Sequence, residues 1–344
     1  MKKAIPPKGS LKGFKISKII KETVQSFNPM MVLKNITKED LEKNLDYEKL
    51  VQVLKKAFQE EYIVPPRHHH NYQNPKAKTD STLLLMPAWQ IGKYLGVKIV
   101  TVSPKNGANG LPSIYGIYTL FDAEKGFPLA QIDAPTLTNQ RTAATSALAS
   151  SFLSKKNSKR LLMIGTGSLA PELIKAHSAV RPIEEVFIWG RNFKKAKALK
   201  KRLKNSSFKI KAIETIEEGI KKADIISCAT LSSEPLVFGK YLKPGQHLDL
   251  VGAYQPTTRE ADDKAIKKSI VFVDTYEGAK ESGDILIPIQ NGILKEKDIR
   301  ADLFQLCRGE KKGRKNANEI TCFKSVGHAL EDLAAAKLIY EKMK

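Results

Sequence analysis

The stretch RLLMIGTGSLAPEL, residues 160–173, most restricts the folds open to this chain. A short apolar run leads into Gly165-Thr166-Gly167, and helix-forming residues follow directly. Gly165, Gly167 and Ala170 have the order Gly-x-Gly-x-x-Ala, which is typical of the first strand-to-helix turn of a dinucleotide-binding fold. There the first glycine permits a tight turn, the second lets a pyrophosphate approach the backbone, and the alanine lets helix and strand pack closely.

Strands and helices alternate after this turn. The predicted strands are RLLMIG, EVFIWG, FKIKAI, ADIISCAT, HLDLVGAY and SIVFVDT, with helices predicted over 193–204 and 215–222. Repeated strand-helix-strand units form a parallel sheet with helices on both faces. We therefore expect an α/β fold with a Rossmann-type, doubly wound parallel sheet.

The first half of the chain has a different pattern. Residues 36–62 place apolar side chains at helical spacing and predict two consecutive helices, with Thr37 and Asp40 as the first cap. The segments STLLLMPAW, GVKIVTVSP, SIYGIYTLFD and FPLAQIDA then predict a largely antiparallel sheet. The final stretch, CFKSVGHALEDLAAAKLIYEKM, predicts an amphipathic helix after a short entry. This half is expected to form a second, α+β domain.

The end of the second predicted strand indicates which dinucleotide binds. An NAD site usually has an acidic residue there, which accepts from the ribose 2′-hydroxyl. This chain has Arg191 and Asn192 instead. Because Arg191 can pair with a 2′-phosphate and Asn192 can donate a hydrogen bond to it, we expect NADPH as the cofactor, with NADH as an alternative.

The charge raises the question of nucleic acid. The chain has 58 basic and 36 acidic residues, a net charge of +22, with dense basic segments in the first 35 residues and at 308–319. The lysines are spread along the whole chain without the aromatic-basic pattern of RNA-binding sheets. We expect a lysine-rich surface and no nucleic-acid partner.

Other classes of protein are also disfavoured. No apolar run reaches the roughly 18 residues of a membrane span, and the N-terminal segment lacks the apolar core of a secretory signal, so a cytoplasmic, non-membrane protein is expected. Cys228, Cys307 and Cys322 have neither disulfide nor metal-site spacing. The side chains of His68–His70 should diverge, with no acidic or Cys partner at ligand spacing, so no metal site is expected.

Several stretches together resemble the ornithine cyclodeaminase/mu-crystallin family. They are VPPR, LLLMPAW, LGVKIV, FDAEKGFPLAQIDAPTLTNQRTAATSALA, MIGTGSLA, DLVGAYQPTTREADD and CFKSVGHALEDLAA. The resemblance covers residues 36–344 and implies a homodimer. It also implies a basic extension over 1–35, a substrate-binding and dimerisation domain over 36–140 plus 320–344, and an inserted NADP-binding domain over 141–319.

The resemblance also implies the site residues. Arg67 and Arg141 would bind the carboxylate of a small cyclic imino acid, and Ser113 would add a hydrogen bond. Lys98 would be the catalytic proton donor, directly or through a water. The implied cofactor-binding residues are Thr142, Gly165, Thr166, Gly167, Ser168, Leu169, Arg191, Asn192, Ala229, Thr230 and Tyr254.

One departure from the family pattern bears on the reaction. Cyclodeaminases of the family have an aspartate after a Val-Gly-x triplet, placed to activate water, whereas this chain has Tyr254 after Val251-Gly252-Ala253. A phenol is a poor general base at neutral pH. The sequence therefore resembles the family's ketimine reductases, which reduce Δ1-pyrroline-2-carboxylate and Δ1-piperideine-2-carboxylate to L-proline and L-pipecolate. Ornithine cyclodeaminase, an alanine-dehydrogenase-like oxidoreductase and a non-catalytic NADPH-binding protein remain as alternatives.

Overall fold

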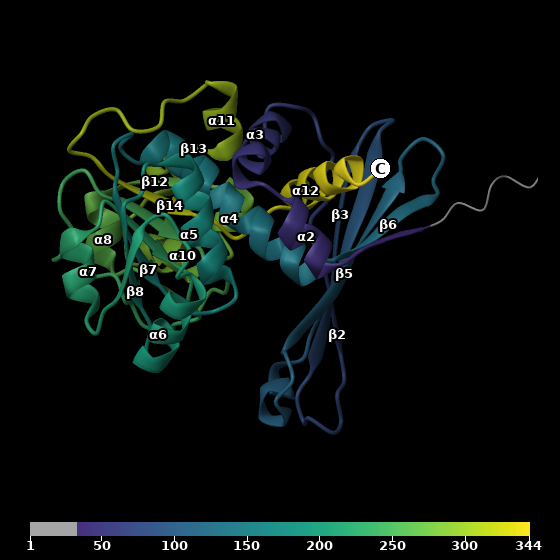
Figure 1. Cartoon of the computed structure of the whole chain (residues 1–344), viewed down its shortest axis with the longest axis horizontal. Helices are drawn as coiled ribbons and strands as arrows, with labels where there is room; N and C mark the ends of the chain where they lie inside the picture. Colours follow the sequence, from purple (N-terminus) through teal and green to yellow (C-terminus); the bar gives the residue numbers. More distant parts are fainter. Residues whose placement is uncertain (1–32) are drawn as a thin grey trace, which may run out of the picture.

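The computed structural model describes residues 33–344, so nearly all of the predicted basic extension lies outside the described residues. Two sheets form the framework, and helices lie between and around them (Figure 1). The first sheet comes from the first half of the chain, and the second sheet comes from residues beyond 159. The predicted α/β class with a separate α+β part is confirmed.

The first sheet has six strands in the order β1-β6-β5-β4-β3-β2. Their bounds are β1 Lys34–Ile36, β2 His68–Tyr72, β3 Ser81–Gln90, β4 Tyr94–Val102, β5 Ile114–Asp122 and β6 Pro128–Asp133. All neighbouring pairs are antiparallel except β1 and β6, which are parallel. The largely antiparallel sheet predicted from the sequence is confirmed. His68, His69 and His70 lie in β2, an exposed edge strand.

The two predicted N-terminal helices are α2 (Lys38–Asn44) and α3 (Tyr47–Ala57). Thr37 and Asp40 form a reciprocal capping box at the start of α2, as predicted. Asp46 caps α3 by accepting from the Lys49 amide. The short 3-10 helix η1, Pro104–Asn109, interrupts the connection between β4 and β5.

The second sheet has eight strands, all parallel, in the order β13-β12-β14-β11-β10-β7-β8-β9. The strand bounds are β7 Arg160–Ile164, β8 Glu185–Trp189, β9 Lys209–Ala212, β10 Ile225–Cys228, β11 His247–Leu250, β12 Ser269–Val273, β13 Ala301–Asp302 and β14 Ile320–Lys324. The helix bounds are α5 Leu169–Val180, α6 Phe193–Arg202, α7 Ile216–Lys222, α8 Asp263–Lys268, α9 Tyr276–Ala279, α10 Gly283–Gln290, η2 Glu296–Asp298 and α11 Leu303–Arg308.

Both faces of this second sheet are buried. Leu161 and Met163 of β7 belong to one hydrophobic cluster, whereas Leu162 and Ile164 belong to another. Successive side chains of a strand point to opposite faces, so helices cover the sheet on both sides. This confirms the predicted doubly wound arrangement.

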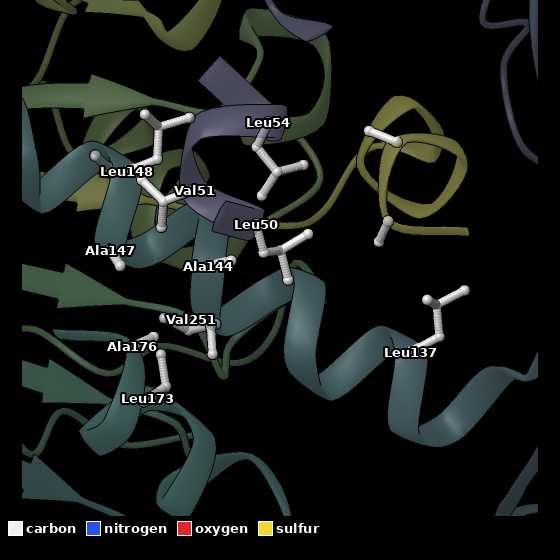
Figure 2. Packing of buried hydrophobic residues seen from close by; sticks show 14 of the residues in the cluster. Leu50, Val51, Leu54, Leu137, Ala144, Ala147, Leu148, Leu173, Ala176 and Val251 are labelled. Carbon is white, nitrogen blue, oxygen red and sulfur yellow. The ribbon is translucent and has the colours of Figure 1, made fainter. Parts of the chain in front are cut away.

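Two helices join the halves of the molecule. Helix α4 (Ala134–Leu153) leads out of β6, and α12 (Ala329–Lys342) returns after β14 to pack on β3, β4, α3 and α4. Figure 2 shows Ala144, Ala147 and Leu148 of α4 between leucines of α3 and residues of α5. The small side chains of α4 let these neighbours approach closely. One hydrophobic core therefore runs through both halves.

The return to the first sheet occurs later than the boundary expected at residue 320. Residues Ile320–Lys324 form strand β14, which pairs with β11 and β12 inside the parallel sheet. All five residues of β14 are buried, because both faces of a central parallel strand are covered. Within residues 33–344, no helix combines the length and apolar character that a bilayer span requires.

Candidate active site

The Gly165–Leu169 turn has the geometry of a pyrophosphate site. Gly165 has a φ of +120°, and a Cβ there would lie 2.5 Å from the Ala229 carbonyl oxygen, so only glycine fits. A Cβ on Gly167 would meet nothing within 4 Å, which leaves its backbone open to a ligand. Ser168 precedes α5 and makes no side-chain cap within the described residues. The amides of this helix N-terminus fit an anionic pyrophosphate.

Arg191 and Asn192 follow β8, next to this turn. A Cβ on Gly190 would lie 2.6 Å from Cγ2 of Thr166, so the two loops touch. Arg191 is exposed. Asn192 caps α6 by accepting from the Lys194 and Lys195 amides, so its side-chain oxygen is engaged and its amide group remains as a donor.

The remaining predicted cofactor residues lie on three segments. Ala229 and Thr230 follow β10, and Tyr254 follows β11 with 40% of its surface exposed. Both segments leave the carboxyl edge of the parallel sheet, where doubly wound proteins bind their ligands. Thr142 lies on α4 directly after Arg141. The structure therefore gathers the turn and the two loops at one edge.

A buried charge cluster lies on the side of the first sheet. Lys98 of β4 donates from Nζ to Oδ2 of Asp332 at 2.7 Å, and Arg141 of α4 donates from Nε to Oδ1 of the same carboxylate at 2.9 Å. Arg141 also pairs with Glu331 through Nη1. The side chains of Lys98 and Arg141 are 5% and 4% exposed, and both acids are fully buried. Two predicted site residues, Lys98 and Arg141, thus share one carboxylate.

These contacts perturb the ionisation of the cluster. Burial lowers the pKa of Lys98 to about 8, although Asp332 opposes the shift. Burial raises the pKa of Glu331 to about 7, against the effect of Arg141. Burial would also raise the pKa of Asp332, but the charges of Arg141 and Lys98 hold it below its ordinary value. A buried lysine whose pKa is lowered toward neutrality is suited to acid-base chemistry.

Arg67 reaches the same region from the chain segment before β2. Its Nη2 donates to the Gly327 carbonyl oxygen at 3.2 Å, and its Nε lies 3.8 Å from Glu281. A Cβ on Gly327 would lie 2.6 Å from Nη1 of Arg141. Gly327 thus separates the two predicted carboxylate-binding arginines. Arg67, Gly327 and His69 line a cavity of about 370 Å³.

The cavity adjoins the carboxyl edge of the second sheet. Asp274, which follows β12, accepts from the Val326 and Gly327 amides at 2.6 and 2.7 Å. Thr275 and Gly278, just after that strand, also line the cavity. The loop between β14 and α12 is therefore fixed between the dinucleotide edge and the Lys98 cluster.

Ser113 does not join this cluster within the chain. It precedes β5 and accepts from the Ser103 amide through its backbone oxygen. Its position is roughly 16 Å along the strand from Tyr118, which is paired with Lys98. The role of Ser113 in substrate binding stays a prediction.

Glu331 and Asp332 are site residues that the sequence reasoning missed. Their signal was an acidic pair inside an otherwise Ala- and Leu-rich helix, α12, in which both carboxylates are fully buried. Buried acids of this kind require cationic partners. Among the described residues no group of three or more His, Cys, Asp and Glu side chains is arranged to hold a metal ion.

Comparisons with known proteins agree with this geometry. The model of the "Ornithine cyclodeaminase/mu-crystallin family" matches residues 31–344. A Δ1-pyrroline-2-carboxylate reductase of Colwellia psychrerythraea is 36% identical over 318 residues, which cover 90% of this chain and 99% of the relative.

Two solved structures share the fold. The Δ1-pyrroline-2-carboxylate reductase of Thermococcus litoralis, in complex with NADH and L-proline, has a TM-score of 0.81 and 36% identity and covers 90% of this chain and 97% of its own. An archaeal alanine dehydrogenase dimer with bound NAD has a TM-score of 0.82 and 30% identity, with 90% and 95% covered. The chain therefore belongs to the ornithine cyclodeaminase/mu-crystallin family.

Proposed function

We propose that the protein is an oxidoreductase that reduces the C=N bond of cyclic ketimine carboxylates, using a reduced pyridine nucleotide. Δ1-Pyrroline-2-carboxylate and Δ1-piperideine-2-carboxylate would give L-proline and L-pipecolate. The observation that carries the proposal is the buried Lys98–Asp332–Arg141 cluster, whose Arg141 packs on Gly327, a residue that lines the cavity at the carboxyl edge of the parallel sheet. The reductase relatives from Colwellia and Thermococcus support the same reaction class.

The residues of the chain would divide the work as follows. The bound nicotinamide supplies a hydride for the imine carbon. Lys98, with its pKa near 8, is mostly protonated at neutral pH and keeps the imine nitrogen protonated, which makes the adjoining carbon electrophilic. Arg67 faces the cavity and binds the substrate carboxylate.

Arg141 has fewer free hydrogen-bond donors for a substrate carboxylate than the sequence suggested. Its Nε and Nη1 are engaged by Asp332 and Glu331, which leaves Nη2 as the donor for a substrate carboxylate. Asp332 holds both Arg141 and Lys98 in place, so the carboxylate-binding group and the proton donor keep a fixed separation. Such preorganisation lowers the cost of binding the substrate in a reactive orientation.

NADPH is proposed as the preferred reductant. Arg191 is exposed beside the turn that fits the pyrophosphate. The first turn of α6 contains Lys194 and Lys195 and no acidic residue, so no side chain there would repel a 2′-phosphate. The Thermococcus and archaeal relatives were solved with NADH and NAD, so NADH is retained as an alternative.

A homodimer is also proposed. Tyr115 and Ile117 of β5 are 47% and 44% exposed, on the face of the first sheet opposite the buried Tyr118. Exposed aromatic and aliphatic side chains on a sheet face are typical of a protein interface. The alanine dehydrogenase relative is a dimer, which supports the same assembly.

An amino-acid dehydrogenase acting on an open-chain keto acid and ammonia is the second candidate, because that relative matches 90% of this chain. Cyclodeamination is less favoured, because Tyr254 takes the place of the family's water-activating aspartate and is 40% exposed.

The experiment is a steady-state assay of NADPH oxidation with each cyclic imine, with NADH in place of NADPH and with pyruvate plus ammonia as parallel reactions. L-Ornithine plus NAD tests the cyclodeaminase reaction. Rapid oxidation with either imine supports the proposal. Turnover only with pyruvate and ammonia would favour the dehydrogenase, and nucleotide binding without turnover of any substrate would identify a non-catalytic binding protein.

A further inference from the structure

Glu260 lies between the two loops that follow β10 and β11, and it is fully buried. Its Oε1 accepts from the backbone amide and the hydroxyl of Thr230, at 2.6 and 2.9 Å. Its Oε2 accepts from the backbone amides of Gly252 and Ala253, at 2.8 and 3.3 Å. One carboxylate therefore accepts four hydrogen bonds, two from each loop.

These two loops are packed directly on each other and on the glycine turn. A Cβ on Gly252 would lie 2.0 Å from the Thr230 carbonyl oxygen, and a Cβ on Gly165 would lie 2.5 Å from that of Ala229. The loops after β7, β10 and β11 are thus in contact at the carboxyl edge. In a doubly wound sheet, the cofactor extends along this edge away from the turn that holds its pyrophosphate.

Glu260 is itself fixed by a second buried acid. The Glu260 and Ala261 amides donate to Oδ1 of Asp284 at 2.7 and 3.2 Å. Oδ2 of Asp284 accepts from Nζ of Lys324, at the end of β14, at 3.1 Å, and both side chains of this pair are fully buried. The carboxylate that joins the loops is therefore anchored to the middle of the sheet.

We infer that Glu260 is a positioning residue, which sets the spacing of the Thr230 and Gly252–Ala253 loops and thereby shapes the seat of the nicotinamide ring. This inference rests on the proposed use of a nicotinamide cofactor at this edge. A carboxylate suits this position because all four of its partners are donors and both of its oxygens can accept. Burial raises the pKa of Glu260 to about 7, although Lys324 opposes the shift. The amide group of a glutamine would place two further donors against one of the loops.

The test compares Glu260→Gln with a matched control, Asp262→Asn. Asp262 also accepts two backbone amides, each at 2.7 Å: from Ala265 in α8, and from Gly239 in the β10–β11 connection, nine residues beyond Thr230. Both variants lose a buried or partly buried carboxylate acceptor. Only Glu260→Gln removes the acceptor shared by Thr230 and Gly252–Ala253.

The readouts are KM for NADPH, KM for the imine, kcat, and Tm measured without nucleotide. We expect Glu260→Gln to raise KM for NADPH at least about tenfold, which is the size expected when a buried loop amide is left without its acceptor. The KM for the imine should stay within about twofold. Asp262→Asn should lower Tm and leave KM for NADPH unchanged.

Two results would overturn the inference. One is a Glu260→Gln enzyme with the wild-type KM for NADPH and a Tm loss equal to that of the control, which would show a purely structural role. The other is a wild-type protein that binds no nicotinamide nucleotide, in which case the proposed function fails first. If Glu260→Gln does not fold, Glu260→Asp provides the same measurement, because it keeps the charge but is too short to reach both loops.

Discussion

Replacing Asp332 by Asn tests the buried cluster most directly. Asp332 is the acceptor shared by Lys98 and Arg141, whose side chains are only 5% and 4% exposed. Without this charge, Lys98 has no acidic hydrogen-bond partner among the described residues, and Arg141 keeps only Glu331. Removing one partner of a buried ion pair costs about 3–5 kcal/mol, because a buried charge is left uncompensated. We expect Asp332→Asn to lower the free energy of unfolding by about that amount.

Glu331→Gln is the matched comparison, because both acids pair with Arg141 and both are fully buried. Burial raises the pKa of Glu331 to about 7, so its neutral form is substantially populated at neutral pH, and glutamine resembles that form. The contribution of Glu331 to stability is greatest below its unfolded pKa and is lost as the pH rises through about 7. We therefore expect Glu331→Gln to cost less than about 1.5 kcal/mol at neutral pH, and to unfold with a weaker pH dependence than the wild type between about pH 5 and 8.

The assay is urea unfolding at equilibrium, followed by circular dichroism, for the wild type and both variants without nucleotide. Equal costs for the two variants, or an Asp332→Asn protein within about 1 kcal/mol of the wild type, would refute the reasoning. A second readout is the pH dependence of kcat/KM. Asp332 raises the pKa of Lys98 against the effect of burial. In Asp332→Asn, kcat/KM should therefore begin to fall at a lower pH than in the wild type.

Three further predictions concern single residues. Because the pKa of Lys98 is about 8, kcat/KM for the imine should fall as the pH rises above about 8. Lys98→Met should abolish most turnover and this decrease at high pH. The dissociation constant of NADPH, measured by fluorescence, should stay unchanged in this variant. Arg191→Ala should raise KM for NADPH about tenfold and leave KM for NADH unchanged, and an equal effect on both nucleotides would contradict its contact with the 2′-phosphate. Gly165→Ala should lower the free energy of unfolding by about 1–3 kcal/mol and weaken nucleotide binding, because the φ of Gly165 is +120° and the new Cβ would meet the Ala229 carbonyl oxygen. Thermal unfolding and nucleotide titration measure the two effects. A variant with unchanged stability and binding would be evidence against a constrained turn.

The regular parts of the fold could be predicted because local patterns specify them. The cap at Thr37, the alternating strands of the first sheet and the glycine turn all depend on residues close together in the sequence. Strand β14, Ile320–Lys324, could not be predicted, because a short apolar run fits a strand as well as the entry to a helix. Its strand partners, β11 and β12, are distant in the sequence.

The candidate site could be predicted only in part. The basic residues Lys98 and Arg141 were found through family resemblance, and the structure brings them together. Their acidic partners Glu331 and Asp332 were missed because an acidic pair early in a helix also suits an exposed first turn. Only the packing of α12 against β4 and α4 shows that the pair is buried and must neutralise cations.

The position of α12 also has a consequence for how the chain is assembled during synthesis. Lys98 and Asp332 are 234 positions apart, so the first sheet leaves the ribosome long before the helix that completes its core. Closing so long an unstructured loop carries a large entropic cost. Once the parallel sheet has folded, α4 and β14 lie in contact, and the remaining gap to α12 is short. A folded parallel sheet therefore brings α12 close to the first sheet, because only residues 325–328 separate β14 from α12.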